Sequence, residues 1–219
     1  MTNHNENFET TLITASTRGD YEAKTGAVNV PIYVSSTFDQ EHFDSFGPFD
    51  YSRSGNPTRQ ALENTIAELE HGTRGFAFSS GIAAIASALL TLEAGDHLVI
   101  TSEVYGGTYR FVTKVLPKYN ITHTFADFTN LKEVEAAIQD NTKVLYAETP
   151  ANPLLGITDL EGIISIAKKH NLKTIVDNTF MTPLYQKPLD LGADGVLHSA
   201  TKFLGGHSDI IAGLAVTKD

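Results

Sequence analysis

Apolar residues follow two alternating spacings from about residue 58 to residue 200. Segments with apolar residues three or four positions apart, typical of amphipathic helices, lie at 81–95, 108–119, 131–140 and 159–170. Short apolar runs, typical of β-strands, lie around them at 75–80, 97–102, 121–127, 142–149, 173–178 and 195–200. Strands that alternate with helices predict βαβ units, and therefore a mainly parallel sheet with helices on both faces.

Residues 1–57 lack this periodicity and are rich in Thr, Ser, Asn and Phe. We interpret them as an extended N-terminal arm that needs another surface to lie against. Asn56 and Pro57 then favour a helix start, because Asn caps a helix and Pro suits its first position. We therefore divide the chain into an arm, 1–57, and a large domain, 58–219.

Composition narrows the functional class. The formal net charge is -10, which argues against nucleic acid as a partner because phosphate binding needs an excess of Lys and Arg. The chain has no cysteine, so it has neither a disulfide framework nor a thiolate metal site. No apolar run approaches the roughly 20 residues of a membrane helix, and the polar N-terminus resembles no signal peptide. We expect a soluble cytoplasmic protein without a membrane partner.

The carboxyl ends of the predicted strands carry most of the chemically useful residues, which is where parallel sheets bind ligands. Ser79, Ser80 and Gly81 join a strand to a helix, where free N–H groups can bind a phosphate that the glycine lets approach. Close packing of a tight turn explains the same residues. Tyr105, followed by two glycines, offers a ring face to a planar ligand or forms an ordinary loop. Glu148 lies at the end of the strand expected at 142–149 and begins a rigid, proline-containing loop.

The last two predicted strands end in further polar residues. Asp177 ends a buried strand, where a carboxylate is costly unless it is paired. Its partner is either a structural cation or the cationic ring nitrogen of a ligand. Ser199 and Thr201 are suitable phosphate ligands, and Lys202 supplies an amine for a Schiff base.

Two other site types fit the sequence poorly. His198, His207 and Asp209 have spacings of i, i+9 and i+11, which match no standard metal-ligand pattern. We therefore predict no metal site. A dinucleotide site on the same architecture requires a glycine-rich fingerprint, which the sequence lacks.

Taken together, the strand-end residues match the parts of pyridoxal 5'-phosphate (PLP). This cofactor has a phosphate, a flat ring, a pyridine nitrogen and an aldehyde, and its enzymes use a lysine and an acidic partner for the ring nitrogen. The sequence offers a phosphate cradle, an aromatic ring, a carboxylate, two hydroxyls and a lysine. We therefore predict a PLP site.

Six motifs carry a resemblance to a known family. They are YSRSGNPTR (51–59), SSGIAA (79–84), VYGGTYR (104–110), ETPANP (148–153), VDNTF (176–180) and HSATKFLGGHSD (198–209). The chain resembles the Cys/Met-metabolism family of PLP-dependent enzymes. The six motifs occur in the same order as in that family and extend over nearly the whole of this chain. The resemblance implies the large domain of PLP-dependent transferase fold type I, which is aspartate-aminotransferase-like: an α/β domain with a mainly parallel, seven-stranded sheet. The family's C-terminal small domain lies outside this chain, so we expect the large domain to be incomplete at its C-terminus.

The resemblance also implies roles for individual residues. Lys202 carries the cofactor and moves protons, Asp177 pairs with the ring nitrogen, and Tyr105 stacks on the ring and carries protons. The implied catalytic residues are thus Lys202, Tyr105 and Asp177. The implied cofactor-binding residues are these three together with Tyr51, Arg53, Ser80, Gly81, Ile82, Asn152, Ser199 and Thr201. Tyr51 and Arg53 match a phosphate-binding pair donated by a neighbouring subunit, which implies a homotetramer of dimers with shared active sites.

The activity implied is a PLP-dependent carbon–sulfur lyase that acts on cystathionine, by β- or γ-elimination, in the transsulfuration steps of methionine and cysteine metabolism. One alternative is a cystathionine γ-synthase, which joins cysteine to an O-acylhomoserine. A further alternative is a truncated, catalytically inactive protein with a PLP-enzyme fold.

Overall fold

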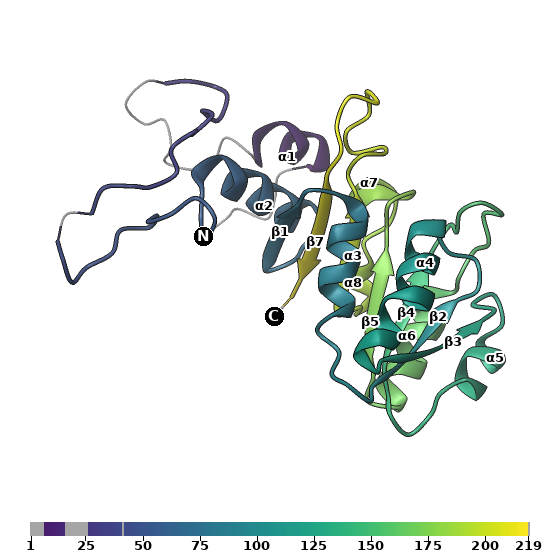
Figure 1. The fold of residues 1–219 in the computed structure, drawn as a ribbon. Helices are drawn as coiled ribbons and strands as arrows, with labels where there is room; N and C mark the ends of the chain where they lie inside the picture. The colour runs from purple at the N-terminus through teal and green to yellow at the C-terminus, as the bar shows by residue number, and fades with distance from the viewer. Residues whose placement is uncertain (1–6, 16–25, 41, 219) are drawn as a thin grey trace.

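A seven-stranded sheet forms the centre of the molecule (Figure 1). The computed structural model describes residues 7–15, 26–40 and 42–218. The strands are β1 (Arg74–Phe78), β2 (His97–Thr101), β3 (Thr122–Ala126), β4 (Thr142–Glu148), β5 (Lys173–Asp177), β6 (Gly195–Ser199) and β7 (Gly213–Thr217). Their spatial order is β1-β7-β6-β5-β4-β2-β3. The neighbours from β6 to β3 pair in parallel, whereas β7 runs antiparallel to both β1 and β6. The predicted mainly parallel, seven-stranded sheet is therefore confirmed.

Helices cover both faces of the sheet because successive strand residues point to opposite sides. In β2, Leu98 and Ile100 pack in a cluster with α3 (Gly81–Leu89) and α4 (Gly106–Lys114). Val99 packs on the other side, with α5 (Leu131–Ala136) and α6 (Leu160–Lys169). Near β6 and β7 a third cluster brings in α2 (Pro57–Leu69) and α8 (Pro188–Leu191). We call the side covered by α3 and α4 the first face and the opposite side the second face.

Several elements differ from the predicted ones. The helix expected at 108–119 is split into α4 and a 3-10 helix, η3 (Leu116–Tyr119). Pro117 explains the break, because proline lacks the N–H of an α-helical hydrogen bond and its ring clashes with the preceding turn. The short helices α7 (Thr182–Tyr185) and α8, like strand β7, lie outside the segments predicted from the hydrophobic pattern.

The N-terminal arm is not extended throughout, contrary to the prediction. Residues Phe8–Thr14 form helix α1, and the Asn7 side chain caps it by accepting a hydrogen bond from the Thr10 N–H at 3.1 Å. Residues 26–40 and 42–56 contain no strand longer than an isolated bridge, and this segment reaches away from the sheet (Figure 1). Helix α2 begins at Pro57 with Asn56 as its N-cap, as predicted.

Hydrophobic helices long enough for a membrane are not found in the described part of the chain. Its longest α-helix, α2, has 13 residues.

Candidate active site

A cavity of about 250 Å³ lies at the carboxyl ends of β4, β5 and β6. Glu148, Asp177 and Ser199, the last residues of these three strands, all line it. The predicted site residues in its lining are Ser80, Gly81, Ile82, Tyr105, Asn152, Asp177, Ser199, Thr201 and Lys202. Of the predicted set, only Tyr51 and Arg53 are not in the lining. Residues from five of the six motifs thus meet in one place because parallel strands bring their carboxyl ends to one edge.

The pleat of the strands selects which side chains reach the cavity. In β6, Leu197 packs on the first face and Val196 on the second. Ser199 therefore points to the first face, where it contacts α3 and lines the cavity. The same alternation in β5 places Asp177 on the first face. A shift of one residue in either strand would turn these groups away from the cavity.

Helix α3 begins at the edge of the cavity. Ser80 is its N-cap, and its side-chain oxygen accepts a hydrogen bond from the Ala83 N–H at 3.2 Å. The first N–H groups of a helix have no partner within the helix and can bind an anion. A Cβ atom on Gly81 would lie 2.6 Å from the Cβ of Ser199. Close packing of α3 on β6 therefore requires this glycine, whether or not a phosphate approaches it.

Asp177 is buried and firmly oriented. Its Oδ1 accepts hydrogen bonds from the N–H of Thr179 at 3.0 Å and from the Thr179 hydroxyl at 2.5 Å, and its Oδ2 accepts one from the hydroxyl of Tyr146 at 3.4 Å. Burial raises the pKa of Asp177, although the hydrogen bonds from Thr179 partly oppose this. A cation placed in the cavity would restore the charged form of this carboxylate.

Thr179 is a functional residue that sequence reasoning missed. Its hydroxyl donates to Asp177, and the hydroxyl oxygen also accepts from the backbone N–H of Ser199 at 2.8 Å. The hydroxyl therefore links the ends of β5 and β6 beneath the cavity. A signal was available in the sequence, because an Asp followed two residues later by Thr is a common local side-chain-to-backbone motif.

Glu148 is a second residue to which the sequence gave no role. Its exposed fraction is 6%, and its two oxygens accept backbone hydrogen bonds from Tyr105 at 2.9 Å and Asn152 at 3.0 Å. Burial, followed by the charge of nearby Asp177, raises the pKa of Glu148 to about 7. The cavity thus contains two carboxyl groups that are costly to ionise together.

Lys202 lies in the turn that follows β6, and its backbone N–H donates to the carbonyl of Ser199 at 3.1 Å. Its side chain lines the cavity and, within the described ranges, makes no hydrogen bond or ion pair. Thr201 is held by Ala212, whose N–H donates to the Thr201 hydroxyl oxygen at 3.1 Å. Lys202 therefore brings an unpaired amine to a cavity that already holds two carboxyl groups.

Tyr51 and Arg53 form a separate pair in the arm. The Arg53 guanidinium lies 5.0 Å from the centre of the Tyr51 ring, a cation–π contact. The Tyr51 side chain is partly exposed. Their action on a neighbouring subunit's cofactor stays a prediction.

Comparison with known proteins decides the family. The family described as Cys/Met metabolism PLP-dependent enzyme matches residues 9–219. The chain belongs to this family. The chain is 58% identical to cystathionine beta-lyase MetC of Bacillus subtilis, over 100% of its own length and 56% of that protein. It is 55% identical to a cystathionine gamma-lyase of the same organism, over 95% of its length and 55% of that protein.

A solved member of the family has the same fold. The crystal structure of cystathionine gamma-lyase from Lactobacillus plantarum, complexed with L-serine, matches with a TM-score of 0.94 and 52% identity. The match covers 98% of this chain and 55% of the other. The fold implied by the resemblance is thus confirmed, and the chain spans about half the length of the relatives it matches.

The residues of this chain fit the cofactor of the family. An amine, an oriented carboxylate, a helix N-terminus with neighbouring hydroxyls and a half-exposed aromatic ring all border one cavity. The raised pKa of Asp177 marks a buried carboxyl group that a cationic ring nitrogen would stabilise in its charged form. The lining thus offers groups suited to the aldehyde, the ring nitrogen and the phosphate of PLP.

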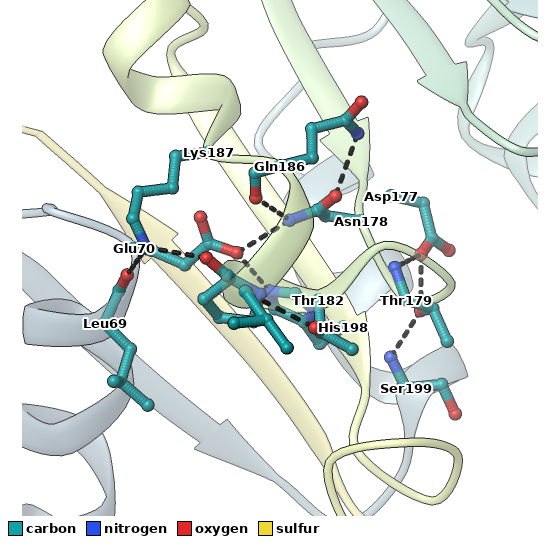
Figure 2. Close-up of polar contacts among 12 residues, drawn as sticks. Leu69, Glu70, Asp177, Asn178, Thr179, Thr182, Gln186, Lys187, His198 and Ser199 are labelled. Atoms are coloured by element: carbon teal, nitrogen blue, oxygen red, sulfur yellow. Dashed lines mark hydrogen bonds and ion pairs between the residues drawn. The ribbon is translucent and has the colours of Figure 1, made fainter. Parts of the chain in front are cut away.

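A buried polar network joins the end of α2 to residues of the second face (Figure 2). Glu70, at the end of α2, lies with its Oε1 2.6 Å from Nε2 of His198 and accepts a hydrogen bond from Asn178 at 2.9 Å. Gln186 donates a hydrogen bond of 2.9 Å to the side chain of Asn178. Lys187 donates one of 2.8 Å to the backbone oxygen of Leu69, the last residue of α2. This network ties α2 to the strand ends that carry Asp177 and Ser199.

The network also accounts for His198. It pairs with Glu70 and is 1% exposed, whereas His207 is exposed and contacts the backbone of Gly205. No cluster of three or more His, Cys, Asp or Glu suited to a metal occurs among the residues that the structure describes.

The raised pKa of Glu148 makes a prediction about pH. In the folded chain Glu148 has a pKa of about 7 instead of 4.5. Between these two pH values the folded chain therefore keeps a proton on Glu148 that the unfolded chain releases. Its contribution to stability therefore falls as pH rises through the interval, by at most about 1.4 kcal/mol per pH unit. In Glu148→Gln this loss is absent, so the stability of the variant relative to the parent chain rises with pH. Urea unfolding at a series of pH values, without added PLP, measures the difference; a difference independent of pH would contradict the assignment.

Proposed function

We propose that this chain is the PLP-binding part of a carbon–sulfur lyase that cleaves cystathionine. The observation that supports the proposal most directly is that Lys202, Asp177 and Ser199 border one cavity at adjoining strand ends. A free amine, a buried carboxylate and a phosphate-binding hydroxyl at such positions are what PLP chemistry requires. The names of the relatives support the choice of substrate.

Each part of the cofactor has a candidate partner in the cavity. Asp177 would hold the ring nitrogen in its protonated form, and the ring of Tyr105 would lie against the cofactor ring. Asn152 would contact the phenolic oxygen. The phosphate would be bound by the start of α3, at Ser80, Gly81 and Ile82, and by the hydroxyls of Ser199 and Thr201.

PLP, when bound, supplies an electron sink for the electron pair left on the substrate after its α-proton is lost. Lys202, once its amine is free, would take that α-proton as general base. The hydroxyl of Tyr105, which is half-exposed at the cavity, would act as the second proton carrier near the departing sulfur. Asp177 would stay ionised throughout and hold the positive charge of the ring.

Elimination from Cβ and elimination from Cγ of cystathionine remain two forms of one proposal, since relatives with either activity in their names match this chain almost equally well. The two forms release different products. Cleavage at Cβ consumes water and gives homocysteine, pyruvate and ammonia, whereas cleavage at Cγ consumes water and gives cysteine, 2-oxobutyrate and ammonia. An assay with both keto acids as standards separates them.

The experiment that tests the cofactor assignment uses the purified chain with added PLP. We expect a visible absorption band, and after borohydride reduction a phosphopyridoxyl label on the peptide that contains Lys202. A label on another lysine, or no label at all, would overturn the assignment for this chain. The labelled chain is then assayed first with cystathionine and next with cysteine plus O-acylhomoserine. Turnover of cysteine plus O-acylhomoserine alone would change the proposal to a γ-synthase. A labelled chain that turns over neither would identify an inactive protein.

We further propose a homotetramer in the cytoplasm, with each active site shared between two subunits. The support comes from the arm, where Ile32 is 82% exposed and Val34 is 91% exposed. Apolar side chains at this exposure are typical of a surface that another chain covers. Sedimentation of the protein, with and without residues 1–57, would measure the contribution of the arm to assembly.

A further inference from the structure

Two loops of the cavity wall meet at one side chain. The loop after β2 carries Tyr105, and the loop after β4 carries Asn152. Glu148, the last residue of β4, accepts a hydrogen bond from the backbone N–H of Tyr105 with Oε2 and one from the backbone N–H of Asn152 with Oε1. One carboxylate therefore bridges the two loops, at 2.9 Å and 3.0 Å.

We propose that Glu148 is a positioning residue that clamps the loops of Tyr105 and Asn152 together and so fixes these two side chains against the cofactor ring. This inference deepens the proposed function and rests on it for the identity of the cofactor. Both oxygens of Glu148 bind backbone N–H groups of the two loops, so its role is to position other residues and not to take part in the reaction itself.

The geometry around Tyr105 shows why such a clamp is needed. Tyr105 is the N-cap of α4, but its side chain makes no capping hydrogen bond. Its ring lies over Gly107, where an added Cβ would be 2.3 Å from the ring atom Cε1. Gly107 therefore supports one side of the ring, and the bond to Glu148 fixes the backbone from which the ring projects. The ring is otherwise 45% exposed.

Burial makes both bonds strong once Glu148 is ionised, above its pKa of about 7. Glu148 is 6% exposed, so solvent competes little for its two oxygens. Hydrogen bonds to an ionised carboxylate are shorter and about twice as strong as neutral ones. A carboxylate is also the only acidic or amide side chain with two equivalent acceptor oxygens. Glutamine, of nearly the same shape, keeps one acceptor and presents an N–H₂ group to the other backbone N–H.

Hydrogen exchange in the chain without PLP tests the clamp separately from the cofactor. In Glu148→Gln we expect exchange of the Tyr105 or the Asn152 amide to become about ten- to a hundredfold faster. The matched control is Glu133→Gln, since Glu133 accepts a similar backbone hydrogen bond from Asp127 at 2.9 Å at the end of β3, outside the cavity lining. The control should leave both amides unchanged. Unaltered exchange of both amides in Glu148→Gln would overturn the proposal.

A second measurement on the parent chain keeps the proposal testable if the variant does not fold. The amide proton shifts of Tyr105 and Asn152 should titrate with one shared midpoint, because both N–H groups share one carboxyl group. Asp177 and Tyr146 are the titratable side chains beside this group, and an Asp177→Asn variant separates the titration of Asp177 from that of Glu148. Amide shifts that stay constant while Glu148 titrates would contradict the clamp.

The cofactor provides the readout that a merely structural role would not change. With PLP bound, Glu148→Gln should weaken cofactor affinity about tenfold and reduce the circular dichroism of the cofactor band, because the Tyr105 ring is no longer held at one angle. Faster amide exchange in Glu148→Gln, together with no PLP binding by the parent chain, would mean that the clamp holds and the cofactor assignment fails. Faster amide exchange with an unchanged cofactor spectrum would show that the bridge is structural only, and would overturn the positioning role.

Discussion

Lys202→Ala is expected to abolish covalent attachment of PLP and to lower cystathionine cleavage by about 10²- to 10⁴-fold or more. The variant loses the amine that would link the cofactor, and with it the general base for the α-proton. Lys202 lies in a turn and its side chain has no partner within the described ranges. Its truncation should therefore leave the fold intact and change only the chemistry.

Mass spectrometry after borohydride reduction checks this expectation, together with steady-state rates of keto-acid release. The matched control is Lys143→Ala, because Lys143 is exposed near the start of β4, at the end of the strand opposite the cavity. The control should keep both the label and the rate. A normal rate in Lys202→Ala would show that another amine serves the reaction.

Glu70→Ala is expected to lower the free energy of unfolding by about 2–5 kcal/mol. The Glu70 and His198 side chains are both 0% exposed and lie 2.6 Å apart. Removing Glu70 would leave the imidazole without this partner, deprive Asn178 of one acceptor, and create a cavity beside α2. Each of these changes is costly in a site that solvent cannot reach. The midpoint of urea unfolding, at an unchanged slope, measures the loss.

The chain provides a surface pair of the same chemistry as a control. His71 and Asp190 lie 2.8 Å apart, with side chains 55% and 45% exposed. Exposed pairs contribute about 0–1 kcal/mol, so Asp190→Ala should cost far less than Glu70→Ala. Equal losses in the two variants would show that burial does not make the Glu70–His198 pair important.

The sequence predicts the order of most strands and helices because their signal is local. The apolar runs that became β1 to β6 and the helical stripes between them match the observed elements to within a few residues. The residues at the strand ends could be predicted for the same reason, since Asp177 and Ser199 each end an apolar run. The parallel arrangement then brings these ends to one edge without further information.

Other features depend on which elements become neighbours, and the local pattern does not contain that information. Strand β7 was not predicted from the hydrophobic pattern, although the resemblance implied a seventh strand, and its position between β1 and β6 comes from long-range pairing. Helix α1 was missed because the arm lacks a clear apolar stripe. The action of Tyr51 and Arg53 on a neighbouring subunit is still a prediction, as is the division of the chain at residue 57.

The sequence alone therefore determined the α/β class, the family and nine of the fifteen residues that line the cavity, because motifs and periodicity are carried by neighbours along the chain. Only the tertiary structure decided how those residues are held. The contact of Gly81 with Ser199, the bridge from Glu148 to Tyr105, and the pairing of Glu70 with His198 each join residues far apart in the sequence. Such contacts form when strands take one register and helices pack on one face, and no local pattern of side chains specifies that packing by itself.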